Sequence, residues 1–198
     1  ACSKSNKSDI AETAEKLLET VKVWYSRKDL DEGPDTITYN AVINCWSKSN
    51  RPEAPQRALD ILKTMTCGYK EDGNENIRPN AITYNSVLDA HARQGDIEGA
   101  SQVFSMMKDD YRSGNKNAKL GVKTYTALID AWSKSENQEA PIQAELLLKE
   151  MIDLYLGQEL DGGPNTITYN AVINCWSKSN RPEAPQRALD ILKTMTCG

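Results

Sequence analysis

The feature that most constrains this chain is its internal repetition. Residues 36–68 recur without one change as residues 166–198, and both copies read TITYNAVINCWSKSNRPEAPQRALDILKTMTCG. Two weaker copies lie between them, AITYNSVLDAHARQ from Ala81 and VKTYTALIDAWSKS from Val122, so the starts fall 45, 41 and 44 residues apart. Repetition at such a period indicates an array of similar units that stack on their neighbours, because one unit cannot bury its apolar face alone.

Each unit has the apolar spacing of two helices. In the first, Tyr39, Val42, Ile43 and Trp46 fall at i, i+3, i+4 and i+7, and in the second Ala58, Ile61, Leu62 and Met65 repeat that spacing. Prolines stand near the second helix start, where a helix tolerates them, and Gly- and Pro-bearing loops follow the second helix. We therefore expect an all-α fold with a partial unit over 1–35, complete units over 36–80, 81–121 and 122–165, and a shortened unit over 166–198. The chain reads as a slice of a longer array.

Composition limits the chemistry. No apolar run approaches the length of a membrane span, the five cysteines include no C-x-x-C pair, and His91 is the single histidine. His91 stands where Trp46 and Trp132 stand in other units, and the eight tyrosines open first helices or close second helices, so we expect all of these to pack. We expect no catalytic residue, no metal, no cofactor, no membrane contact and no small-molecule substrate.

The repeat resembles that of a known family. First helices open T-I-T-Y-N-A-V-I-N, A-I-T-Y-N-S-V-L-D and V-K-T-Y-T-A-L-I-D, second helices follow A-x-x-I/V-L/F-x-x-M, and two loops end in Pro-Asn. No unit supplies the Leu-Gly step of a tetratricopeptide first helix. Over essentially the whole chain the pattern resembles the pentatricopeptide repeat family, although these units are longer than is usual there. The resemblance implies a right-handed superhelical α-solenoid of stacked helix-turn-helix repeats.

The resemblance also implies single-stranded RNA as partner, with about one base read per repeat. The residue after each first-helix tyrosine, paired with the last residue of its unit, would select the base. The pairs are Asn40 with Asn80 (cytosine above uracil), Asn85 with Gly121 (a loose pyrimidine preference) and Thr126 with Asn165 (adenine), while Asn170 has no partner and Asp35 fits uracil or guanine. Ile37, Ile82 and Ile167 would sandwich the bases, and Lys123 takes that place in the third unit.

Two of these assignments have simpler alternatives. Asn is a frequent helix cap, and a lysine on a helix usually faces solvent. A basic residue nevertheless recurs near the end of every first helix, at Lys4, Lys48, Arg93, Lys134 and Lys178, which favours a row of phosphate contacts. The net charge is −4, yet the segments 36–51, 81–95, 122–137 and 166–181 hold seven basic and three acidic residues. Their +4 suits RNA, and the remainder carries −8.

The predicted function is sequence-selective RNA binding in RNA stability, processing or translation, organellar by the resemblance and without catalysis. Other proteins are possible partners of the outer loops. The alternative is a helical scaffold that binds a protein segment, as tetratricopeptide arrays do.

Overall fold

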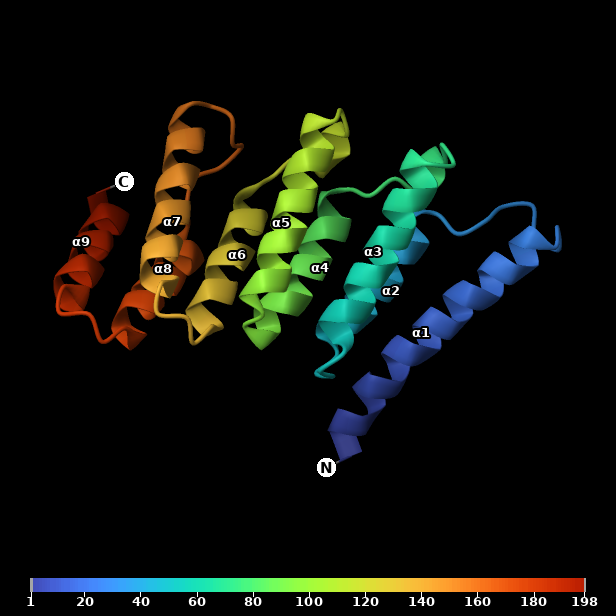
Figure 1. Ribbon diagram of the computed structural model, residues 1–198, viewed down its shortest axis with the longest axis horizontal. Helices are drawn as coiled ribbons and strands as arrows, with labels where there is room; N and C mark the ends of the chain where they lie inside the picture. The colour runs from blue at the N-terminus through green and yellow to red at the C-terminus, as the bar shows by residue number, and fades with distance from the viewer. Residues whose placement is uncertain (1, 198) are drawn as a thin grey trace. The chain divides into compact units, whose positions relative to one another are not determined.

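The all-α expectation is confirmed. A computed structural model describes the backbone of residues 2–197 and the side chains of residues 10–195, and these residues contain α-helices and two short 3₁₀ helices but no strand (Figure 1). The helices are α1 (Cys2–Ser26), α2 (Thr36–Lys48), α3 (Ala54–Lys70), α4 (Ala81–Gln94), α5 (Ile97–Arg112), α6 (Val122–Lys134), α7 (Ala140–Leu156), α8 (Thr166–Lys178) and α9 (Ala184–Cys197). The 3₁₀ helices are η1 (Glu75–Ile77) and η2 (Lys116–Ala118).

The chain divides into two compact units, residues 1–90 with 109–119 and residues 91–108 with 120–198. In unit 1, α1 packs on α2, α2 packs on α3, and η1 contacts both α2 and α3. In unit 2, α6 packs on α7 and α8, α7 also packs on α8, and α8 packs on α9. Figure 1 shows the pairs α2 with α3, α6 with α7 and α8 with α9 side by side. Each pair is one helical hairpin of the repeat.

Local chemistry explains where the helices begin and end. The first helices α2, α6 and α8 end at a serine in extended conformation, whose amide donates back to the last turn. The second helices α3 and α7 begin with a proline in the first turn, which lacks the amide hydrogen that a helix start leaves unpaired. A short linker therefore reverses the chain within each hairpin.

The expected apolar stripes form the core. In unit 2 one cluster joins Ile129 of α6, Leu148 of α7, Val172 and Trp176 of α8 and Ile191 of α9. In unit 1, Ile43, Trp46, Leu62 and Met65 are buried. Leu17 differs from the expectation because α1 leaves it exposed, whereas its counterpart Ile61 is buried.

The tyrosines pack in two different ways, and Tyr25 and Tyr155 remain 48% exposed. Among those that open first helices, Tyr39, Tyr84 and Tyr125 are buried. Those that close second helices lie against the following loop: a Cβ at Gly33 or Gly163 would come within 2.9 Å of the ring of Tyr25 or Tyr155. The other two receive a cation, with Arg78 4.7 Å from the Tyr69 ring centroid and Lys116 4.9 Å from that of Tyr111. The closing tyrosine is thus the surface on which each inter-repeat loop folds.

Candidate nucleic-acid interface

Three isoleucines at the second position of first helices are exposed to an unusual degree. Ile37 of α2, Ile82 of α4 and Ile167 of α8 have exposed fractions of 76%, 64% and 68%. Two residues further on, Tyr39 and Tyr84 are buried. A single exposed apolar side chain is ordinary, but recurrence at one position of three helices indicates that this position is available to a flat apolar partner in each of these repeats. Lys123, at the same position of α6, is also exposed.

The last residue of three of the repeats, Asp35, Asn80 or Asn165, caps the next first helix through its side chain. Asp35 Oδ1 accepts from the Thr38 amide (2.8 Å) and hydroxyl (2.7 Å). Asn80 Oδ1 accepts from the amides of Ile82 (3.0 Å) and Thr83 (3.1 Å), and Asn165 Oδ1 accepts from those of Ile167 (3.0 Å) and Thr168 (3.1 Å). The hydrogen bonds from the Thr38 amide and hydroxyl hold the pKa of Asp35 below its usual value. The capping interpretation is therefore confirmed for Asp35, Asn80 and Asn165.

Capping leaves half of each carboxamide unused. Only an oxygen can accept from backbone amides, so these bonds fix which end of Asn80 and Asn165 faces the helix. Within the described residues, Nδ2 of either side chain makes no hydrogen bond as a donor. Gly121 has no side chain to offer, and its amide donates to Thr124 Oγ1 at 3.2 Å. Base contact and capping are thus compatible for an asparagine, because the two use different atoms.

The fifth residues of the first helices do not cap. Asn40 Nδ2 donates to Asn80 Oδ1 at 3.4 Å, so the structure brings together the two residues of the first predicted pair. Asn40 Oδ1 and Asn85 Oδ1 are buried acceptors with no hydrogen-bond partner in the described part of the chain. A buried acceptor without a partner costs about 1–3 kcal/mol, so two of them at equivalent positions call for an explanation. Asn170 is exposed.

In the third repeat, residues 122–165, the two residues of the predicted pair, Thr126 and Asn165, are connected through Thr168. Thr126 Oγ1 lies 2.7 Å from Thr168 Oγ1, which in turn donates to Asn165 Oδ1 at 3.2 Å. Thr168 and its equivalents Thr38 and Thr83 are not among the residues that the repeat pattern assigned to the site. The spacing of Asp or Asn three residues before Thr, ahead of an apolar stripe, is the signal that would have indicated them.

Packing of the preceding loop holds Asn80 in position. The Pro79 carbonyl accepts from Asn115 Nδ2 at 2.8 Å, and the same nitrogen donates to buried Asp110 Oδ2 at 2.6 Å. Asp110 Oδ2 also accepts from the Tyr84 hydroxyl at 3.0 Å, and burial together with this carboxylate raises the pKa of Tyr84. The chain entering α4 is therefore fixed by a buried polar network next to the cap.

The basic residues expected to contact phosphate differ in whether their side chains already contact other groups of the protein. Lys48 and Arg93 are exposed. Lys134 Nζ lies 2.5 Å from Asp130 Oδ2, and Lys178 Nζ donates to the Ser133 carbonyl at 2.7 Å. An exposed ion pair such as Lys134–Asp130 contributes little, so a phosphate could displace it. The side chain of Lys4 lies outside the described residues.

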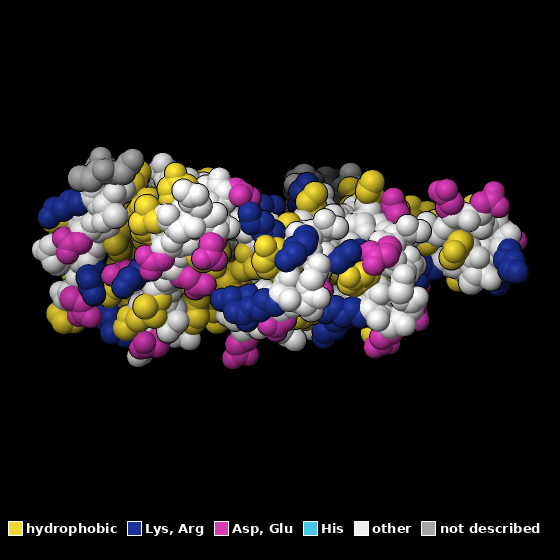
Figure 2. All heavy atoms as spheres, turned by 90° about the horizontal axis from the view of Figure 1, so that it is seen from above, with side chains coloured by type: hydrophobic (Ala, Val, Ile, Leu, Met, Phe, Trp, Pro, Cys, Tyr) yellow, Lys and Arg dark blue, Asp and Glu magenta, His cyan; other side chains and the backbone are white. Residues whose placement is uncertain are grey.

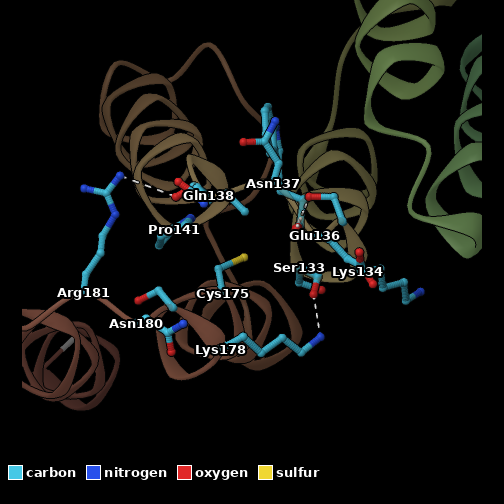
Figure 3. Close-up of a pocket in the computed structure, with 14 residues that line it drawn as sticks. Ser133, Lys134, Glu136, Asn137, Gln138, Pro141, Cys175, Lys178, Asn180 and Arg181 are labelled. Atoms are coloured by element: carbon cyan, nitrogen blue, oxygen red, sulfur yellow. Dashed lines mark hydrogen bonds between the residues drawn. The ribbon is translucent and has the colours of Figure 1, made fainter.

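Lys134 and Lys178 border a groove in unit 2. It has a volume of about 800 Å³, lies between the α6–α7 and α8–α9 turns, and includes Arg181 and Cys175 in its lining (Figure 3). Arg181 is bound to Glu139 at 2.8 Å, and burial raises the pKa of the Cys175 thiol to about 12. Burial therefore keeps the Cys175 thiol in its protonated form at neutral pH.

Charge is mixed on one face of the molecule. Figure 2 shows basic and acidic side chains intermixed on the face seen from above, so that face is not uniformly acidic.

No helix of the described residues is both long and apolar enough to cross a bilayer. His91 is buried, with Nδ1 2.7 Å from Asp96 Oδ2, and no group of three His, Cys, Asp or Glu suited to a metal ion occurs in the part of the chain that is described.

Comparison with known proteins identifies the repeat. The profile of the PPR repeat family matches residues 79–134, and that of the PPR repeat matches residues 37–67 and 167–197. Together these matches cover more than half of the chain. The chain belongs to the pentatricopeptide repeat family. The matched first helices α2, α4, α6 and α8 all have the exposed second residue described above, and α2, α4 and α8 also have the capping Asp or Asn.

The relatives found are much longer than this pentatricopeptide repeat chain. A pentatricopeptide repeat-containing protein of Arabidopsis thaliana is 28% identical over 53% of this chain, which spans 16% of that protein. A mitochondrial leucine-rich PPR motif-containing protein of Mus musculus is 31% identical over 44% of this chain and 6% of its own length. A chloroplastic pentatricopeptide repeat-containing protein of Arabidopsis thaliana is 30% identical over 43% of this chain and 9% of its own length.

Proposed function

We propose that this chain binds single-stranded RNA and that each repeat reads one base. The observation that carries the proposal is the exposed isoleucine at the second position of three first helices, Ile37, Ile82 and Ile167, each two residues after a helix-capping Asp or Asn. An apolar side chain beside a hydrogen-bonding group matches the two parts of a nucleobase, its flat face and its polar edge. Recurrence at one position of three repeats matches a partner that presents a similar flat group to each of them.

The capping bonds give the pairs a definite hydrogen-bonding direction. Asn165, at the end of the third repeat, offers Nδ2 as a donor, and Asn80, at the end of the first repeat, does the same. A donor there matches the ring nitrogen of adenine or cytosine, which accepts a hydrogen bond, rather than that of guanine or uracil, which donates one. Asp35 offers only acceptors and suits the opposite bases. The proposed tract is (U/G)-(C/U)-pyrimidine-A-pyrimidine from the N-terminal to the C-terminal repeat.

The unpartnered acceptors support the same proposal. Asn40 Oδ1 and Asn85 Oδ1 lie at the positions that the family resemblance assigns to base reading, and each lacks a hydrogen-bond donor among the described residues. Lys48, Arg93, Lys134 and Lys178 would neutralise the phosphates. We propose no catalytic step. The bound tract is held or masked, and its stability, processing or translation changes as a result. The named locations of the mitochondrial and chloroplastic relatives favour an organelle.

The exposed isoleucines provide the test. Replacing Ile37, Ile82 and Ile167 together by alanine should weaken binding of the tract by at least about tenfold, because three apolar contacts to bases are lost while no buried side chain is removed. Fluorescence anisotropy with a labelled RNA that contains the tract measures this. Leu156→Ala is the matched control, because Leu156 is 72% exposed but ends a second helix. Equal loss in both variants, or none in the triple variant, would contradict the proposal.

A further inference from the structure

We infer that the threonine at the third position of α4 and of α8, Thr83 and Thr168, determines base selectivity by positioning the two base-reading residues of the preceding repeat. The inference rests on the proposed function and adds Thr168 and Thr83 to the proposed interface as positioning residues. Neither side chain is expected to touch a base, because both are fully buried.

Thr168 contacts both residues of the third pair. It receives the Asn165 amide at 3.4 Å and donates its hydroxyl proton to Asn165 Oδ1 at 3.2 Å. A hydroxyl has one proton, so Thr126 is then the donor in the 2.7 Å contact between the two threonine oxygens. Thr168 is the only residue of this trio that is bonded to both of the others.

This chain of hydrogen bonds sets a donor and acceptor pattern. Thr126 gives its proton to Thr168, so only its lone pairs remain for a base. Asn165 Oδ1 is occupied by the cap and by Thr168, so only Nδ2 remains. An acceptor beside a donor complements adenine, whose amino group donates and whose neighbouring ring nitrogen accepts. A purine with a keto group in place of the amino group has the reverse pattern, because its carbonyl oxygen accepts and its neighbouring ring nitrogen donates. Its contacts with Thr126 and with Asn165 would then both be mismatched.

The first pair repeats the arrangement in unit 1. Thr83 Oγ1 receives the Asn80 amide at 3.1 Å and donates to Asn80 Oδ1 at 3.2 Å, and Asn40 Nδ2 donates to the same oxygen at 3.4 Å. Asn40 is left with its oxygen and Asn80 with its nitrogen. This is again an acceptor beside a donor, and the pattern suits cytosine over uracil.

Thr124 shows what the same threonine does where there is no amide to orient. It is fully buried at the third position of α6, receives the Gly121 amide at 3.2 Å and lies 3.9 Å from Met107 Sδ. Gly121 has no side chain, so Thr124 orients no base-reading amide. Thr124→Val therefore reproduces the loss of a capping hydroxyl without any change to a base-reading amide.

The experiment compares Thr168→Val with Thr124→Val on two RNAs that differ only at the base facing the third repeat, adenosine or inosine. Valine keeps the branched shape and removes the hydroxyl. The unaltered chain should bind the adenosine RNA about tenfold more tightly, the effect of a hydrogen-bonding group left without a partner. Thr168→Val should reduce that ratio to about twofold or less, Thr124→Val should leave it unchanged, and Thr168→Ser, which restores the hydroxyl, should recover it.

Each outcome has a distinct meaning. A Thr168→Val chain that keeps the full ratio would overturn the inference while leaving the proposed function intact, and so would a Thr124→Val chain that loses it. An unaltered chain that binds neither RNA would overturn the proposed function and the inference with it. Should Thr168→Val fail to fold, Thr83→Val makes the same test in unit 1 with cytidine against uridine, and an unchanged ratio there would equally overturn the inference.

Discussion

At the scale of single residues, capping and base reading are two uses of one side chain. Asp35, Asn80 and Asn165 use Oδ1 for the start of a helix, and each keeps a second polar atom. The repeat pattern identifies these residues, because an Asp or Asn before an apolar stripe is a helix start. It does not reveal which atom remains for a base, because that depends on the direction of the first amides of the folded helix.

The sequence also could not predict the contacts of the residues at the fifth position of the first helices. Asn40 and Asn85 have the same type and the same place in the repeat, yet Asn40 donates to a neighbouring cap and Asn85 is 7% exposed. Thr126 is bonded to a threonine 42 residues away. Contacts of this kind depend on how successive hairpins pack, which no local pattern encodes.

Thr126→Asn should shift the third repeat from adenine toward a pyrimidine. Asparagine extends further from the backbone than threonine, so less space remains for a two-ring base, and the pair then has the composition of Asn40 with Asn80. Anisotropy with adenosine or cytidine at that position measures the change, and the preference should reverse. Thr126→Ser keeps a short hydroxyl and should still favour adenosine. A preference unchanged by Thr126→Asn would contradict the assignment of Thr126 to base reading.

At the scale of helices, two identical sequences occupy different surroundings. Residues 36–68 form α2 and α3, and residues 166–198 include α8 and α9. Leu62 of α3 is fully buried, whereas its counterpart Leu192 of α9 is 45% exposed. On another face the order reverses, because Cys175 of α8 is buried and Cys45 of α2 is only partly so. The sequence predicts both hairpins equally well. Burial is decided by neighbouring helices, so the sequence of the hairpin alone cannot predict it.

Leu62→Ala and Leu192→Ala should therefore have unequal effects on stability. The first removes a fully buried side chain and should lower the free energy of unfolding by about 2–5 kcal/mol. The second changes a half-exposed side chain and should cost below about 1 kcal/mol. Urea denaturation followed by far-ultraviolet circular dichroism compares them, and Leu59→Ala with Leu189→Ala is a second matched pair. Equal losses within a pair would show that the two copies have the same surroundings.

At the scale of the whole molecule, the charge of −4 conceals a division. The first-helix segments carry +4 and contain Lys48, Arg93, Lys134 and Lys178, so an acidic protein still offers a basic residue in each of its first helices. In an array of similar units, binding is the sum of contacts made by successive repeats. Sequence selectivity then requires that a change of base opposite one repeat weakens binding through that repeat alone.

The most direct test of base reading is a single substitution in the RNA. Anisotropy is measured with a labelled single strand containing U-C-U-A-C and with the same strand carrying guanine in place of adenine. The adenine strand should bind at least about tenfold more tightly, because guanine faces Thr126 and Asn165 with its donors and acceptors exchanged. Equal affinity for the two strands, or no affinity for either, would contradict the account.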